Sequence, residues 1–301
     1  MTTAATTTAP NAPRAPLAKL GVVLEMIKIE HTLFALPFAF LGALLAANGI
    51  PSLSQIALIC VAMVGARSAA MAFNRLVDRE YDAKNPRTSG RALPAGLLSV
   101  PFVWGFTAAA SALLIGAAAL LNPLALWLSP VALALVFFYS LTKRFTAWSH
   151  AWLGIALAVA PIGAWVAVRG SLAEWTPFLI GAAVICWLIG FDIIYALQDV
   201  DFDKKAGLNS VPAKYGAQNA LLIGRVAHAA MIGFLVLVGV AGHLGVWYYA
   251  GVALAALLIA VEHAIIRPDE LKRLNIAFFN VNIAVSTGLL FFTAIDVLTR
   301  R

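Results

Sequence analysis

Long apolar stretches recur along almost the whole length of the chain. They cover residues 33–49, 54–73, 102–121, 123–141, 150–168, 175–197, 219–241, 244–264 and 276–297. Each has roughly 20 residues, enough for one helix to cross the hydrocarbon core of a bilayer. Only 12% of the residues are charged, about half the usual fraction of a soluble domain. The pattern predicts an all-α, multi-pass transmembrane helix bundle with about nine spans, since a helix satisfies its own backbone hydrogen bonds in lipid.

Basic residues gather on one side of the predicted membrane. If the N-terminus is cytoplasmic, 16 of the 21 Lys and Arg residues fall on that side, in the N-terminal tail or in loops. The positive-inside rule then predicts an integral cell (inner) membrane protein whose charged loops face the cytoplasm. The net charge of +7 reflects this topology and an affinity for anionic membrane lipid, and it indicates no nucleic-acid partner.

The first thirty residues lack the apolar core of a signal peptide. We expect residues 1–30 to form a disordered tail and an amphipathic interfacial segment around residues 17–29. Residues 31–301 then form a single transmembrane domain. The pattern specifies no oligomeric state.

Acidic residues stand mainly at the ends of two apolar stretches. Seven of the fourteen Asp and Glu residues are there: Asp78, Glu80, Asp82, Asp192, Asp199, Asp201 and Asp203. If the second stretch continues as a helix, Asn74, Asp78 and Asp82 lie on one face, because residues four apart are neighbours. Asp192, Asp199 and Asp203 repeat this pattern around the end of the sixth stretch, with Tyr195 close to their face.

This spacing favours a metal site over a solvated helix end. Carboxylates four residues apart repel one another and destabilise a helix unless a cation lies between them. A single motif is explained by pairing with nearby Arg and Lys residues, but two motifs on one side of an acid-poor chain favour metal binding. Oxygen ligands without His or Cys nearby suit Mg²⁺, whose coordination is commonly completed by substrate phosphates. The predicted ligands are Asn74, Asp78, Asp82, Asp199 and Asp203.

Charged residues inside or just after the spans add candidates for substrate binding. Asp192 and Arg67 lie within apolar stretches, where a charge is unfavourable and normally faces a cavity or a partner. They form either a neutralising structural pair or part of a binding site, and one pair can do both. Basic side chains near the acidic motifs are suited to a diphosphate. They are Arg87, Arg91, Lys143 and Arg144.

At these residues the chain resembles the UbiA superfamily of intramembrane aromatic prenyltransferases, most closely its 4-hydroxybenzoate polyprenyltransferase branch. The resemblance spans nearly the whole chain. Its segments are HTLFALPFAF (31–40), RSAAMAFNRLVDREYD (67–82), RTSGRALPAG (87–96), YSLTKRFTAWSHAWLG (139–154), DIIYALQDVDFDKKAGLNSVPAKYG (192–216) and AFFNVN (277–282). Arg75 departs from the Asn-Asp that opens the first motif in many relatives. The segment IKIEHT also departs from the Lys-Pro-x-Gly-Thr form of many ubiquinone-pathway members, which leaves the acceptor open.

The resemblance implies nine helices around a central cavity that opens toward lipid. It also implies that a polyprenyl diphosphate loses diphosphate while its allylic carbon attacks an aromatic acid such as 4-hydroxybenzoate, in quinone biosynthesis. Asp192 would bind the phenolic hydroxyl of the acceptor or take a proton from it, and Tyr195 would orient this hydroxyl. His31 is a candidate to line the cavity, or an interfacial polar residue.

Other functions remain open at this point. A menaquinone-pathway naphthoate acid is an alternative acceptor. A proton-coupled transporter also buries Asp and Arg in its spans, although it predicts acids near the midplane and repeated spans. A CDP-alcohol phosphotransferase requires a signature that the chain lacks, and haem or chlorophyll prenylation fits less well.

Overall fold

The structure, a computed structural model, describes residues 16–28, 32–266 and 280–300. The described residues form helices and loops and contain no strand, which confirms the predicted all-α class. The helices are α1 (Pro16–Met26), α2 (Thr32–Ala47), α3 (Leu53–Lys84), α4 (Val100–Leu121), α5 (Pro123–Thr142), α6 (Ser149–Arg169), α7 (Thr176–Ala196), η2 (Leu197–Asp199), α8 (Val200–Ala206), α9 (Val211–Tyr215), α10 (Ala217–Ala241), α11 (Val246–Ile265) and α13 (Asn282–Thr299).

Each predicted apolar stretch overlaps one α-helix of the described residues. Among the described residues, eight helices are long and apolar enough to cross a membrane, and α2 is a shorter apolar helix. The prediction of about nine spans is therefore approximately correct. Helix α1 covers most of the expected interfacial segment, while the tail at residues 1–15 lies outside the described residues.

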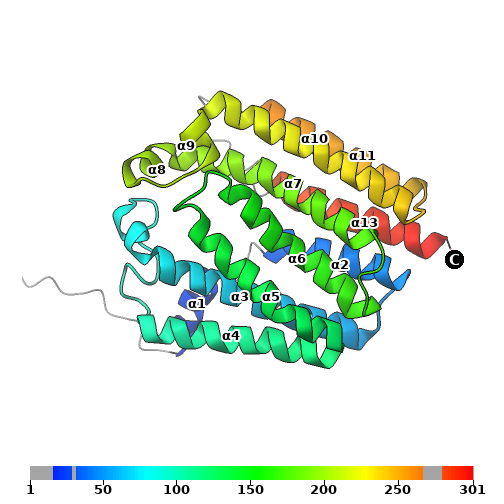
Figure 1. Cartoon of the computed structure of the whole chain (residues 1–301), viewed down its shortest axis with the longest axis horizontal. Helices are drawn as coiled ribbons and strands as arrows, with labels where there is room; N and C mark the ends of the chain where they lie inside the picture. Colours follow the sequence, from blue (N-terminus) through cyan, green and yellow to red (C-terminus); the bar gives the residue numbers. More distant parts are fainter. Residues whose placement is uncertain (1–15, 29–31, 267–279, 301) are drawn as a thin grey trace, which may run out of the picture.

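The bundle has two groups of helices joined by α6 and α2 (Figure 1). Helix α3 packs against α4 and α5, and α5 packs against α6. On the other side of α6, α7 packs against α10, while α2 contacts α13, which packs on α11. The α2–α6 contact is close because Gly42 has no side chain, and an added Cβ would collide with the carbonyl oxygen of Pro161.

Helix α3 extends well past the expected membrane boundary. Its 32 residues give a length of about 48 Å, compared with about 30 Å of hydrocarbon core. A capping box between Ser52 and Gln55 fixes the start of this helix, so the excess length projects from its C-terminal end. The first acidic motif lies on this projecting end.

The charged loops lie at one end of the bundle. In Figure 1 the loop after α3 and helices α8 and α9 are at the end opposite the C-terminus. At the C-terminal end, Arg169 pairs with Glu174, and Arg300 pairs with Asp296. Both of these arginines are thus neutralised by a neighbouring carboxylate.

Candidate active site

A polar cavity of about 300 Å³ lies at the charged end of the bundle. Its walls come from the C-terminal part of α3, the following loop, the α5–α6 connection and the α7–α8 region. Twelve residues selected from the sequence line this one cavity, although they come from segments far apart in the chain. They are Arg67, Asn74, Asp78, Asp82, Arg87, Arg91, Lys143, Arg144, Asp192, Tyr195, Asp199 and Asp203. His31, the thirteenth, lies outside the described residues.

The first acidic motif continues on α3 as a single helical face, as predicted. Asn74 Nδ2 donates a hydrogen bond of 2.9 Å to Asp78 Oδ2, one turn further along the helix. Arg75 donates to Asn74 Oδ1 at 3.1 Å, which fixes the orientation of the amide. Asp82 follows one turn later and is buried. The motif therefore presents an amide and two carboxylates in one row along the cavity wall.

The second motif does not lie on one continuous α-helix, so that part of the prediction is wrong. Helix α7 ends at Ala196, η2 forms a 3₁₀ turn, and α8 resumes the α-helix. A 3₁₀ turn advances about 120° per residue rather than about 100°, so the faces before and after it are rotated by roughly 60°. Asp192, Asp199 and Asp203 nevertheless all line the cavity.

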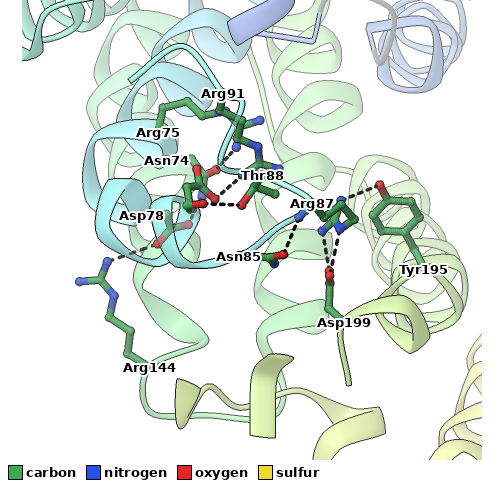
Figure 2. Close-up of polar contacts among 11 residues, drawn as sticks. Asn74, Arg75, Asp78, Asn85, Arg87, Thr88, Arg91, Arg144, Tyr195 and Asp199 are labelled. Atoms are coloured by element: carbon green, nitrogen blue, oxygen red, sulfur yellow. Dashed lines mark hydrogen bonds and ion pairs between the residues drawn. The ribbon is translucent and has the colours of Figure 1, made fainter. Parts of the chain in front are cut away.

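Three arginine side chains, two from the loop after α3 and one from the α5–α6 connection, hold the motif carboxylates (Figure 2). Arg87 binds Asp199 through two hydrogen bonds of 3.0 and 2.6 Å, and its third nitrogen lies 3.4 Å from the Tyr195 hydroxyl. Arg91 donates to Asp82 Oδ1 at 2.6 Å, and Arg144 lies 3.3 Å from Asp78. Two-pronged arginine contacts of this kind bind carboxylates and phosphates alike.

The carboxylates of the cavity stabilise the protonated forms of neighbouring basic side chains. Burial lowers the pKa of the Arg87 guanidinium, but the hydrogen bonds and charge of Asp199 outweigh this and raise it overall. Burial likewise acts to lower the pKa of Lys143, whereas the carboxylates of Asp203, Asp192 and Asp199 raise it above the usual value. Both groups therefore remain protonated at neutral pH, as anion binding requires.

Asp192 has a partner that the sequence analysis did not select. Its Oδ2 lies 2.6 Å from Nδ1 of His150, a fully buried residue near the start of α6. The predicted alternative of an Arg67–Asp192 pair is therefore replaced by an Asp192–His150 pair, while Arg67 donates to the carbonyl oxygen of Lys28. The sequence offered one signal for this residue, because His150 is a polar side chain at the start of the apolar stretch 150–168.

The donor groups fit a hard cation, although they are not gathered around one point. In the described part of the chain, no three acidic, His or Cys side chains converge closely enough to hold a metal. Asp82 Oδ2 and Asp203 Oδ2 are, however, buried oxygens without a hydrogen-bond partner. A buried carboxylate oxygen without a partner is unfavourable, and coordination of a cation would satisfy such an oxygen. The all-oxygen donor set is the type that binds Mg²⁺.

An apolar cavity of about 370 Å³ adjoins the polar one. Five residues line both cavities: Arg67, Met71, Tyr139, Leu153 and Leu157. The rest of the apolar cavity is formed largely by small and aliphatic side chains of α3, α5 and α6. Together the two cavities offer a charged head region and a long apolar region to one ligand.

Comparison with known proteins gives consistent matches over most of the chain. The model of the UbiA prenyltransferase family matches residues 35–284. The 4-hydroxybenzoate octaprenyltransferase of Vibrio cholerae serotype O1 is 34% identical over 255 residues, which cover 82% of this chain and 87% of that protein. The mitochondrial 4-hydroxybenzoate polyprenyltransferase of Arabidopsis thaliana is 36% identical over 74% of this chain and 55% of its own.

Solved structures agree with these matches. The apo structure of a UbiA homolog from Aeropyrum pernix K1 has a TM-score of 0.78 and 36% identity, and covers 90% of this chain and 98% of its own. A UbiA homolog from Archaeoglobus fulgidus, bound to GPP and Mg²⁺, shares the fold with a TM-score of 0.66 and 21% identity over 91% of this chain and 99% of its own. The family match and the identities above 30% are sufficient to assign the family. The chain belongs to the UbiA prenyltransferase family.

Proposed function

We propose that this protein transfers a polyprenyl group from a polyprenyl diphosphate to an aromatic acid, with 4-hydroxybenzoate as the first candidate acceptor. The observation that carries this proposal is the junction of the two cavities. A polar cavity rich in paired acids and cations adjoins an apolar one, and a polyprenyl diphosphate has the same division between a charged head and a long apolar tail. Relatives named 4-hydroxybenzoate octaprenyltransferase support the choice of acceptor.

The reaction requires one bond to break and another to form. The allylic carbon–oxygen bond breaks, and diphosphate leaves with the electron pair. A ring carbon of the acceptor attacks the allylic carbon, and the ring then loses a proton. Mg²⁺ held by Asn74, Asp78, Asp82, Asp199 and Asp203 would neutralise the negative charge on the diphosphate as it departs. These five proposed ligands are the same residues that the sequence predicts.

The basic side chains are suited to bind the two anionic groups. Arg87 and Arg91 lie beside the carboxylates of Asp199 and Asp82 and can donate in pairs to diphosphate oxygens. Lys143 and Arg144, on the α5–α6 side, can bind either the diphosphate or the carboxylate of the acceptor. The aliphatic walls around Leu153 exclude water from the reacting carbon.

Asp192 and Tyr195 act on the acceptor in this scheme. Asp192 lies on α7 itself, whereas Asp199 and Asp203 follow the end of this helix. The Asp192 oxygen that faces the cavity can therefore accept a hydrogen bond from the phenolic hydroxyl or remove its proton. Electron density on the ring rises in either case. The hydroxyl of Tyr195, near Arg87, orients the acceptor.

The cytoplasmic side of the cell (inner) membrane is the proposed location of the polar cavity. The basic loops at the charged end support this orientation through the positive-inside rule. Membrane lipid then surrounds the apolar helices of the bundle.

Prenyl transfer in membranes containing the protein tests the proposal. Radiolabelled polyprenyl diphosphate is supplied with 4-hydroxybenzoate, in the presence of Mg²⁺ or of EDTA. We expect a labelled prenylated acid with Mg²⁺ and loss of the product with EDTA. Labelling of a dihydroxynaphthoate acid instead would keep the reaction and change the acceptor. No labelled product from either acid, with folded protein present, would refute the proposed function.

A further inference from the structure

His150 joins three parts of the molecule at the deepest acidic residue of the site. It lies near the start of α6, and its side chain is fully buried. Its Nδ1 is 2.6 Å from Asp192 Oδ2 on α7, and its Nε2 is 3.3 Å from the backbone nitrogen of Val211, the first residue of α9. Both ring nitrogens therefore have partners inside the protein.

The backbone amide of Val211 determines which nitrogen of His150 carries the proton. An amide N–H can only donate, so Nε2 must accept and is unprotonated. The proton of the neutral ring is then on Nδ1, where it is donated to Asp192 Oδ2. A doubly protonated ring would direct an N–H toward the N–H of Val211, whereas a ring with its proton on Nδ1 matches both partners.

The amide of Val211 is itself held in place by its neighbours. Ser210 is fully buried and caps α9 by accepting from the backbone nitrogen of Ala213. The backbone nitrogen of Asn209 donates to the carbonyl oxygen of Lys143 at 2.8 Å, which ties this segment to the α5–α6 connection. The acceptor position of His150 is therefore built into the fold.

His150 does not line the cavity, whereas Asp192 does. The side chain of Asp192 is 21% exposed, and its Oδ1 has no hydrogen bond to the described residues. One carboxylate oxygen is thus fixed by His150 while the other faces the cavity. A carboxylate with one oxygen fixed in this way has little freedom to rotate.

We infer that His150 is a positioning residue, which holds Asp192 so that Oδ1 meets the phenolic hydroxyl of the acceptor. This inference rests on the proposed function for the identity of the acceptor. The simpler alternative is that His150 only connects α6, α7 and α9. The two differ in whether the effect of His150 on the reaction passes through Asp192.

A double-mutant cycle separates these alternatives. His150→Leu removes both hydrogen bonds, and we expect kcat to fall about 10- to 100-fold, because small misplacements of a reacting group have effects of this size. The KM for polyprenyl diphosphate should stay within about twofold, since the diphosphate end of the cavity is unchanged. In an Asp192→Asn background, His150→Leu should reduce kcat by no more than about twofold further. An equal loss in both backgrounds would overturn the inference.

His150→Gln is the conservative variant, because a carboxamide presents one donor and one acceptor side by side. It should recover most of the kcat lost in His150→Leu. Equal activity of the two variants at equal thermal stability would contradict a positioning role. The matched control is His243→Gln, at an exposed histidine between α10 and α11, which should leave both kcat and KM unchanged.

The ¹⁵N resonances of the histidine rings provide a test that requires no activity. The signal of His150 is identified by its absence in His150→Gln, and it should show a neutral ring protonated at Nδ1. A ring protonated at Nε2 would overturn the inference, even if His150→Leu does not fold. Should the wild-type protein transfer no prenyl group, the proposed function fails, while a ring protonated at Nε2 would still refute the hydrogen-bonding pattern by itself.

Discussion

Replacing Asp199 by Asn should abolish most activity while leaving the protein folded. Both oxygens of Asp199 are bound by Arg87, at 3.0 and 2.6 Å, and the Asp199 side chain is only 11% exposed. Arg87, in contrast, is 39% exposed, so water replaces much of its lost interaction. The asparagine also retains one acceptor oxygen. We therefore expect the free energy of unfolding to fall by only about 1 kcal/mol.

The predicted effect on catalysis is larger. Removing the negative charge takes away a proposed Mg²⁺ ligand where charge develops on the departing diphosphate. Losing one such electrostatic contact typically lowers kcat by about 100- to 1,000-fold, or roughly 2.7–4 kcal/mol. The loss of transition-state stabilisation should thus exceed the loss of folding stability several-fold.

Prenyl transfer in membranes gives kcat, and thermal unfolding in detergent gives stability. The matched control is Asp201→Asn, which removes the same charge only two residues away in the sequence. Asp201 is exposed and does not line the cavity. This control should keep nearly full activity. Activity of Asp199→Asn within about threefold of wild type would refute the assignment of Asp199. Equal losses in Asp199→Asn and Asp201→Asn would show a general charge effect instead.

Two further predictions concern the packing and the apolar cavity. Gly42→Ala should lower the free energy of unfolding by about 1–3 kcal/mol, because the added Cβ meets the Pro161 carbonyl. Gly163→Ala, where the added Cβ enters open space, should not destabilise the protein, and thermal unfolding of the two variants makes the comparison. Ala156→Phe narrows the apolar cavity and should reduce kcat/KM for long polyprenyl diphosphates about tenfold relative to geranyl diphosphate, as kinetics with both donors would show. Ala108→Phe, on an exposed face of α4, should leave that ratio unchanged, and an equal ratio in Ala156→Phe would contradict the role of this cavity.

The helices could be predicted from the sequence because lipid imposes a strict rule on the backbone. Each apolar stretch of roughly 20 residues can satisfy its hydrogen bonds only as a helix, so its length gives the element directly. The continuation of α3 to Lys84 was also accessible, since Asn74, Asp78 and Asp82 follow the helical repeat. The 3₁₀ turn at η2 was not, because no proline or glycine marks the residues from Leu197 to Asp199.

The sequence also selected the residues of the cavity, but not their partners. Charged residues in an apolar chain are few, and membrane burial makes each one informative. Whether two of them touch depends on the rotation and depth of separate helices, which one sequence does not encode locally. Arg87 and Asp199 are 112 positions apart, and His150 and Asp192 are 42 apart. His150 was missed for a related reason. The five histidines are scattered along the sequence, so none of them suggested a cluster before the packing of α6 against α7 was known.

The arginine pairs are consistent with the separation of the proposed Mg²⁺ ligands from one another in the described part of the chain. Arg87 and Arg91 neutralise Asp199 and Asp82, so the polar cavity is close to charge balance without a ligand. A diphosphate offers the same guanidinium groups a more highly charged partner of similar geometry. We expect both arginines to turn toward the diphosphate when it binds, which frees carboxylate oxygens in the cavity that Asp203 also lines. Diphosphate and Mg²⁺ should therefore bind together, since each removes the charge imbalance that the other would create alone.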